Sequence, residues 1–297
     1  MVRPTRAAWC YLIVAAALGC SSTPLAPGGD PGPGPSPTFP VPTGTHSLQR
    51  LTLQSAALGY AKDIYLYLPP GYGQQGARRY PVIYMQDGNK LFAALNAYWV
   101  NWQLEVALTP LILAGRAAPV IVVGIGVNEA LRIKEYTPYV SATATIPTGD
   151  GAAYARFVVE ELKPYIDANY RTLPDRAHTA IGGSSLGGGM ASWIAATYPS
   201  VLGEVAALSA AVRADSAVFE KAVQRGLHTR LYWSRGTLDG EAFNLQRDST
   251  FRTEILALGW VEGRDFRYDV AIGDTHTEAA WGRRVGPLFL FLFPAGG

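Results

Sequence analysis

The sequence predicts an α/β fold with a mostly parallel central sheet and helices on both faces. From residue 81 onward, short apolar runs of the buried-strand type alternate with helical patterns, and this alternation is typical of a parallel sheet with crossover helices. Before it, residues 48–68 alternate apolar and polar side chains and predict an antiparallel strand pair at the sheet edge. The 297 residues, 48% of them hydrophobic, suffice for one large core.

The individual elements can be assigned in chain order. The predicted strands cover residues 48–53, 61–68, 81–85, 119–125, 179–181, 205–208, 230–234 and 266–272. The predicted helices cover residues 99–114, 151–170, 190–198, 214–224, 252–258 and 281–293. We expect Pro164 to kink the second helix, because proline removes a helical hydrogen bond. A polar loop is expected at residues 129–138, and a mobile segment at residues 143–150.

The first residues predict an export signal. Arg3 and Arg6 give a charged start, and the apolar run at residues 7–18 is too short for a permanent membrane span. The run ends before Cys20 in a pattern that resembles a bacterial lipoprotein signal, although Ala17 stands where leucine is preferred. We therefore expect Cys20 to be lipidated, since it would otherwise be an unpaired thiol in an exported protein. An ordinary cleaved signal peptide with a chance cysteine is the alternative.

These signals divide the chain into three parts. Residues 1–19 are the predicted lipoprotein-type signal peptide, and residues 20–44, rich in proline and glycine, the predicted disordered tether. Residues 45–297 are the predicted catalytic domain. The expected location is periplasmic or at the cell surface, with a lipid anchor as the only membrane contact.

Composition excludes several functional classes. The net charge of +2 matches the two N-terminal arginines, so the rest of the chain is neutral and its charge gives no argument for nucleic-acid binding. The two cysteines, Cys10 and Cys20, both precede the folded domain. A disulfide, a thiolate metal site and a cysteine nucleophile are therefore excluded there. No metal or cofactor is implied.

The main chemical signal is the glycine-rich stretch at residues 177–189. It contains G-x-S-x-G as Gly183, Ser185 and Gly187, after a predicted strand and before a predicted helix. This context is that of the nucleophile elbow of α/β-hydrolases, in which a strained turn exposes the serine above the sheet. Glycine is needed on both sides of Ser185, because side chains there would collide with neighbouring segments. The alternative, a turn that only reverses the chain, is disfavoured by the partner residues that follow.

A serine nucleophile needs a base, and the base needs an acid to orient it. Two histidines follow Ser185. His276 stands in the loop after the last predicted strand, where this fold presents its base, whereas His228 lies in a polar connection and is expected to be exposed. The acid should follow the preceding strand, which makes Asp239 the first choice and Glu241 the reserve.

The developing oxyanion needs two backbone N–H donors. We expect one from Leu186, directly after the nucleophile, and the other from Asn89, in the turn after the strand at residues 81–85. Within the expected loop at residues 129–138, Arg132 is a candidate contact for an anionic group of the substrate. A surface ion pair is the favoured alternative for Arg132.

Seven motifs support a family resemblance. They are IYLYLPPGY at 64–72, YMQDGN at 84–89, RIKEYTP at 132–138, ELKPYIDANYRT at 161–172, IGGSSLGG at 181–188, RGTLDG at 235–240 and GDTH at 273–276. On these motifs the chain resembles the α/β-hydrolase family that includes esterase D, antigen 85, feruloyl esterases and enterochelin esterases. The resemblance implies an α/β-hydrolase fold with helices on both faces of its sheet.

The resemblance also implies a function. Ser185 would be the nucleophile, Asp239 the acid and His276 the base, with the N–H groups of Asn89 and Leu186 forming the oxyanion hole. The expected activity is hydrolysis of a small-molecule or polysaccharide ester through an acyl-enzyme. Two alternatives remain, an acyltransferase with the same residues and a catalytically inactive binding lipoprotein on a hydrolase fold.

Overall fold

The computed structural model describes residues 44–95, 100–138, 149–210, 227–240 and 242–296. The predicted signal peptide, the lipidation site Cys20 and almost all of the tether lie outside these residues. The same holds for the helix predicted at 214–224, for the reserve acid Glu241 and for most of the segment predicted to be mobile at 143–150.

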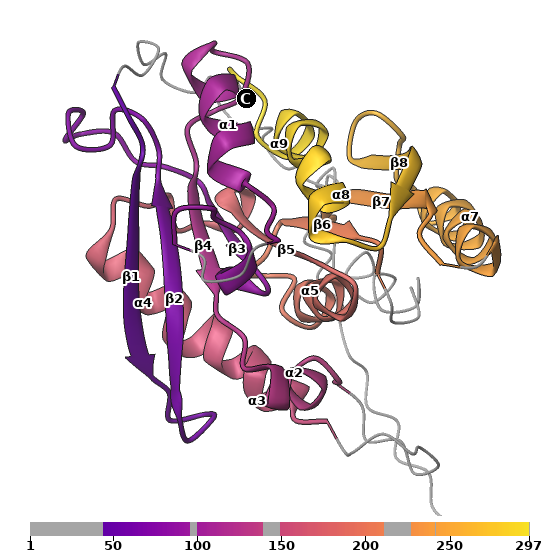
Figure 1. Cartoon of the computed structure of the whole chain (residues 1–297), viewed down its shortest axis with the longest axis horizontal. Helices are drawn as coiled ribbons and strands as arrows, with labels where there is room; N and C mark the ends of the chain where they lie inside the picture. The colour runs from indigo at the N-terminus through magenta and orange to yellow at the C-terminus, as the bar shows by residue number, and fades with distance from the viewer. Residues whose placement is uncertain (1–43, 96–99, 139–148, 211–226, 241, 297) are drawn as a thin grey trace, which may run out of the picture. The chain divides into compact units, whose positions relative to one another are not determined.

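Eight strands form one mixed sheet in the order β1-β2-β4-β3-β5-β6-β7-β8 (Figure 1). The strands are β1 (Ser47–Gln54), β2 (Ala61–Leu68), β3 (Val82–Met85), β4 (Ile121–Ile125), β5 (Thr179–Ser184), β6 (Glu204–Leu208), β7 (Arg230–Leu238) and β8 (Phe266–Thr275). β1 pairs with β2, and β2 with β4, in antiparallel register. All later pairs are parallel. The predicted edge pair and the mostly parallel α/β fold are therefore confirmed.

Helices cover both faces of the sheet. The described helices are α1 (Leu104–Leu113), α2 (Glu129–Glu135), α3 (Gly151–Arg156), α4 (Lys163–Asn169), α5 (Leu186–Thr197), α7 (Ala242–Ala257), α8 (Glu278–Arg283) and α9 (Val285–Leu292), with short 3-10 turns η1 (Gly88–Lys90) and η3 (Arg176–His178). None of the helices in these ranges has the length and apolar composition that a membrane span requires.

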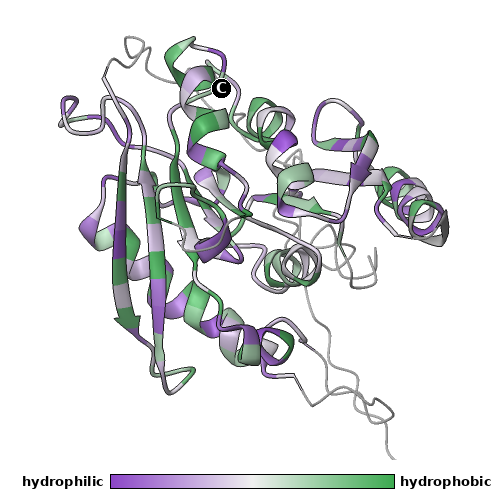
Figure 2. Ribbon diagram, in the orientation of Figure 1, coloured by the Kyte–Doolittle hydropathy of each residue, from purple (hydrophilic) through white to green (hydrophobic). Residues whose placement is uncertain are grey.

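Two hydrophobic cores, one on each face, follow from the alternation of side chains along the strands. On β2, Ile64 and Leu66 point into one core, whereas Tyr65 and Tyr67 point into the other. The first core also receives α5 and α7, and the second receives α1, α8 and α9. Figure 2 shows hydrophilic and hydrophobic bands alternating along β1 and β2.

The structure corrects the expected loop at residues 129–138. Residues Glu129–Glu135 form the helix α2, which begins after Asn128. The Asn128 side chain accepts a hydrogen bond from the Ala130 N–H at 3.0 Å and so caps a donor that the helix leaves free. The polar composition of this segment concealed a short capped helix.

Other predicted elements differ in their bounds. The helix predicted at 99–114 begins only at Leu104, and the terminal helix divides into α8 and α9 at Arg284. The helix predicted at 151–170 is continuous but contains a π-helical segment, η2 (Phe157–Leu162). This segment ends two residues before Pro164, and the wider turn accommodates a residue that has no N–H to donate.

Candidate active site

Ser185 lies in a sharp turn between β5 and α5. Its backbone has φ 55° and ψ −128°, a conformation that residues with side chains seldom adopt. A Cβ atom on either Gly183 or Gly187 would lie 2.8 Å from the Cβ of Gln86, in the turn after β3. Glycine is therefore required on both sides of Ser185, as the motif predicts, and the obstacle is this neighbouring turn.

Leu186 begins α5 directly after Ser185. The first N–H groups of a helix have no acceptor within the helix, and they carry the positive end of its dipole. No acceptor for the Leu186 N–H lies among the described residues. The Ser185 N–H, by contrast, donates to the carbonyl of Leu208 at 2.9 Å. The turn thus presents a free donor beside the serine hydroxyl.

His276 joins Ser185 to Asp239. Its Nε2 lies 2.8 Å from Ser185 Oγ, and its Nδ1 is hydrogen-bonded to Asp239 Oδ1. With Nδ1–H donating to the carboxylate, Nε2 is left to accept the serine proton. The Trp281 ring and the imidazole form a T-shaped contact, with ring centres 5.0 Å apart at 83°. The structure therefore brings three of the predicted site residues into one hydrogen-bonded chain.

The Asp239 carboxylate is fully buried at the carboxyl end of β7. Burial raises the pKa of Asp239, but hydrogen bonds from His276 and Ser209 and the nearby Arg235 charge outweigh it and hold the pKa below its ordinary value. Asp239 is therefore ionised at neutral pH and suited to fixing the imidazole.

Sequence reasoning missed Ser209, which follows β6 and is completely buried. Its backbone has a positive φ of 51°. Its Oγ accepts hydrogen bonds at 3.0 Å from Trp281 Nε1 and from Arg284 Nη1. These donors occupy both lone pairs of the hydroxyl, which leaves its proton for the neighbouring Asp239. No local pattern marks Ser209, because its partners lie more than seventy residues later in the chain.

The turn after β3 contains Asn89, the second predicted oxyanion donor. The Asn89 side chain is used structurally, since its Oδ1 accepts the Val127 N–H at 3.0 Å. Its backbone N–H has no acceptor in the part of the chain that the structure describes. Asn89 and Leu186 therefore share the property that an oxyanion donor needs, an N–H that no other group of the described residues accepts.

Arg132 lies on α2. It pairs with Asp87, which lies in the turn after β3, two residues before Asn89. Its Nε and Nη2 donate to the two carboxylate oxygens at 2.9 and 2.8 Å. The pair is more buried than a surface ion pair, since 18% of the Arg132 side chain and 6% of the Asp87 side chain are exposed. The contact is therefore bidentate, with both Asp87 carboxylate oxygens accepting a hydrogen bond from Arg132.

The remaining histidines lie away from Ser185 in other contacts. His228 is half-buried rather than solvent-exposed, with its ring centre 3.9 Å from that of Trp260. Burial lowers the pKa of His228. His46 stacks against Tyr67, and His178 pairs with Asp175.

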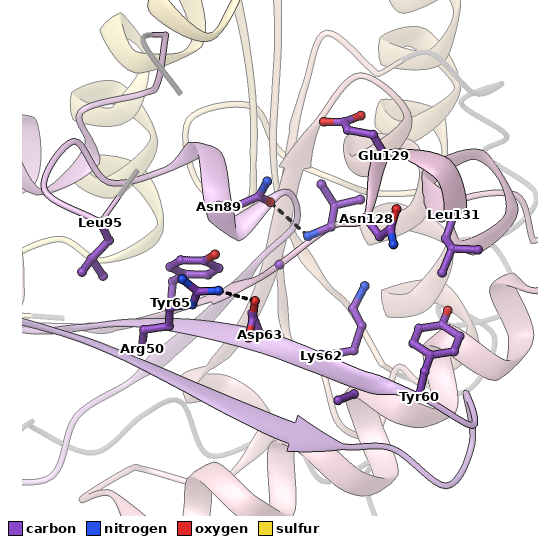
Figure 3. A pocket seen from close by; sticks show the side chains of 13 residues that line it. Arg50, Tyr60, Lys62, Asp63, Tyr65, Asn89, Leu95, Asn128, Glu129 and Leu131 are labelled. Carbon is purple, nitrogen blue, oxygen red and sulfur yellow. Dashed lines mark hydrogen bonds and ion pairs between the residues drawn. The ribbon is translucent and has the colours of Figure 1, made fainter. Parts of the chain in front are cut away.

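A cavity of about 590 Å³ opens beside Asn89, at the sheet edge where β4 ends and β2 begins (Figure 3). Polar and apolar side chains both line it, as Figure 3 shows for Tyr60, Asp63, Asn128, Glu129 and Leu131. The carboxyl ends of the parallel strands β4 and β5 lie at the same end of the sheet. The cavity follows β4 and Ser185 follows β5, so both lie at this end.

Comparisons with known proteins agree with this architecture. The family model described as "Putative esterase" matches residues 55–287. The protein YbbA of Bacillus subtilis (strain 168) is 26% identical over 197 residues, 64% of this chain and 74% of that protein. An endo-1,4-beta-xylanase/feruloyl esterase of Xylanibacter ruminicola is 28% identical over 162 residues, 53% of this chain but only 20% of that enzyme. A solved ferulic acid esterase superposes with a TM-score of 0.62 and 22% identity, over 85% of this chain and 99% of that one.

Proposed function

The chain belongs to this esterase family, and from that premise we propose that it is a serine esterase with Ser185 as its nucleophile. Family membership supports ester hydrolysis as the general class of reaction. The single observation that carries the finer proposal is the continuous hydrogen-bonded chain from Ser185 through His276 to Asp239. This alignment of nucleophile, base and acid favours an active esterase over a catalytically inactive binding protein.

In the proposed first half-reaction, Ser185 Oγ attacks the ester carbonyl while His276 Nε2 takes the hydroxyl proton. Asp239 stabilises the imidazolium that forms and remains ionised itself. Collapse of the tetrahedral intermediate breaks the bond to the alcohol oxygen, which leaves with the proton from His276. The acyl group then remains on Ser185 as an ester.

In the second half-reaction, water takes the place of the alcohol. His276 removes a proton from the water as it attacks the acyl-enzyme, and then returns the proton to Ser185 Oγ. The products are one carboxylic acid and one alcohol. We propose that the N–H groups of Leu186 and Asn89 bind the oxyanion in both halves, which is supported by the absence of an acceptor for either N–H within the described ranges.

For the substrate we propose a small-molecule or polysaccharide ester. The names of the similar proteins, a ferulic acid esterase and a xylanase/feruloyl esterase, support screening of feruloyl esters beside short acyl esters. The cavity next to Asn89 is the proposed place for a part of the ester that does not react, since it lies beside the proposed oxyanion donor. Product analysis with added alcohols would detect acyl transfer in place of hydrolysis.

Replacement of Ser185 by alanine tests the proposal. We expect Ser185→Ala to lower kcat on the order of 10⁶-fold, because the attacking group is lost. Circular dichroism and thermal unfolding should remain close to those of the parent protein, since the side chain leaves no large cavity. A Ser185→Ala protein with undiminished turnover would refute the assignment.

We also propose that the protein is exported and anchored through lipid on Cys20. The charged start, the short apolar run and the following cysteine support this proposal. Two acyl chains and the proline-rich tether would hold the catalytic domain near a membrane surface. Membrane fractionation of a Cys20→Ser variant tests it, and continued membrane association of that variant would count against the anchor.

A further inference from the structure

We infer that Arg132 is a positioning residue, which holds the turn bearing Asn89 and neutralises Asp87 beside the proposed oxyanion hole. This role differs from contact with an anionic substrate, and it rests on the proposed function of Ser185. Four features of the structure lead to it: backbone conformation, the contacts of Asp87, the closeness of Asp87 to the elbow, and the fixation of α2.

The first feature is the backbone of Asp87. It has φ 56° and ψ 42°, the left-handed conformation, and lies directly before Gly88 and Asn89. A non-glycine residue stays in this conformation only where its surroundings hold it. The direction of the Asn89 N–H depends on the turn that Asp87 starts.

The second feature is the set of contacts that hold Asp87. Arg132 donates two hydrogen bonds to its carboxylate, at 2.8 and 2.9 Å. The Asp87 backbone N–H donates to the hydroxyl of Tyr136 at 3.1 Å. Arg132 lies on α2 and Tyr136 follows that helix directly, one helical turn later. A single segment therefore holds both the side chain and the backbone of the residue that starts the turn.

The third feature is the distance to the elbow. A Cβ atom on Gly187 would lie 3.1 Å from Asp87 Oδ2. The carboxylate is thus packed against the turn two residues after Ser185, in a buried position. An unpaired negative charge there would oppose the growth of an oxyanion, and it would do so in a site of low dielectric constant. The guanidinium of Arg132 offsets that charge.

The fourth feature is the fixation of α2 itself. Glu135, at the end of α2, is 1% exposed and pairs with the Lys62 ammonium on β2 at 2.8 Å. The hydroxyl of Tyr60 donates to the same carboxylate at 2.6 Å. Because α2 is tied to β2 in this way, Arg132 has a rigid base from which to hold Asp87.

The test is a set of variants assayed with 4-nitrophenyl acetate, a neutral ester, and with an ester that carries a carboxylate. We expect Arg132→Gln to lower kcat about 10- to 100-fold on both esters, with KM changed less than about threefold, because the donors are misplaced and the Asp87 carboxylate loses its cationic partner. Asp87→Asn removes that charge and tolerates the left-handed backbone. The double variant Arg132→Gln/Asp87→Asn should therefore recover part of the lost kcat.

Arg252→Gln is the matched control, since Arg252 on α7 forms an exposed pair with Glu262, which lies beyond the end of that helix. Its kinetics should equal those of the parent protein. Should Arg132→Gln not fold, Arg132→Lys keeps the charge without the bidentate contact, and its kcat should lie between those of the parent and the double variant.

Three results would overturn the inference. Parent-like kcat in the Arg132 variants would show that the pair is not needed. A loss confined to KM for the anionic ester would assign Arg132 to substrate binding. A double variant no more active than Arg132→Gln would show that the Asp87 charge is irrelevant. A parent protein without esterase activity would instead refute the proposed function, and this inference with it.

Discussion

The carboxyl and amino ends of the central strands differ in backbone conformation and in the partners of their buried carboxyl groups. At the carboxyl ends, Asp87, Ser185 and Ser209 follow β3, β5 and β6 with positive φ angles. Among the described residues, one further non-glycine residue, Gln103, has a positive φ, and it precedes α1. Two buried carboxylates at this end have close partners, since Asp87 is paired with Arg132 and Asp239 is hydrogen-bonded to His276.

At the amino ends, a buried carboxylate is poorly paired. Glu204 begins β6, and the nearest cation, Arg230 Nη1, lies 4.0 Å away. Burial raises the pKa of Glu204 to about 8, so its carboxyl is largely protonated at neutral pH. The comparison teaches that three of the four positive φ angles of described non-glycine residues lie at the carboxyl ends, where Ser185 also lies, whereas Glu204 at the amino end is a buried carboxyl without a close cation.

Among the variants that test this comparison, the largest effect should come from Asp239 at the carboxyl end. We expect Asp239→Asn to lower kcat by about 10⁴-fold, because the amide favours the wrong imidazole tautomer while the geometry survives. Steady-state kinetics with a chromogenic ester measures this effect. Glu241→Gln is the companion variant, and a severe loss in Glu241→Gln with normal activity in Asp239→Asn would assign the acid to Glu241.

An intermediate effect should come from steric crowding at the elbow. A Cβ on Gly187 would lie 2.8 Å from Gln86 Cβ, whereas a Cβ on Gly286, in α9, would meet only Leu111 Cδ1 at 3.8 Å. We expect Gly187→Ala to lower kcat about 10- to 100-fold and to cost about 1–3 kcal/mol of stability. Gly286→Ala should keep full activity and gain about 0.5–1 kcal/mol.

Kinetics and thermal unfolding of both glycine variants complete this test. Equal kcat and equal stability of Gly187→Ala and Gly286→Ala would mean that the turn after β3 moves at little cost to make room for the added Cβ. The contrast between a strained carboxyl end and a regular remainder would then lose its main steric support.

The smallest effect on activity should come from the amino end. The native state keeps a proton on Glu204 up to about pH 8, whereas an unfolded chain loses it near the ordinary value of 4.5. Unfolding therefore releases a proton between these pH values, and stability falls as pH rises through this window. Glu204→Gln cannot ionise, so it should exceed the parent protein in stability on the order of 1–3 kcal/mol at pH 8, with kcat unchanged.

Denaturant unfolding at pH 5 and at pH 8 measures this difference. The gain from Glu204→Gln should be small at pH 5 and larger at pH 8. A gain that is independent of pH would contradict the protonated state of Glu204, and a loss of kcat would contradict the separation of the two ends.

Much of the fold could be predicted from the sequence, because its signals are local. Apolar runs mark the strands, and G-x-S-x-G marks the turn at Ser185 through its own glycines. The known chain order of the fold then pointed to His276 and Asp239, which the structure places in contact with each other. Their catalytic roles stay a prediction.

The remainder depends on contacts between distant segments. Ser209 accepts hydrogen bonds from Trp281 on α8 and from Arg284. No pattern near Ser209 in the sequence predicts these contacts. The sequence favours a surface ion pair for Arg132, with contact to an anionic substrate group as the other reading, and it does not identify the buried partner Asp87, which lies 45 residues earlier. The short helix α2 escaped prediction, since seven residues give too few turns for a clear helical period.

Intact-mass analysis after treatment with a fluorophosphonate tests the central claim most directly. The reagent modifies a serine only where a base activates its hydroxyl. We predict one adduct on the parent protein and none on Ser185→Ala. No adduct on the parent, or an equal adduct on Ser185→Ala, would contradict the assignment of Ser185 as an activated nucleophile.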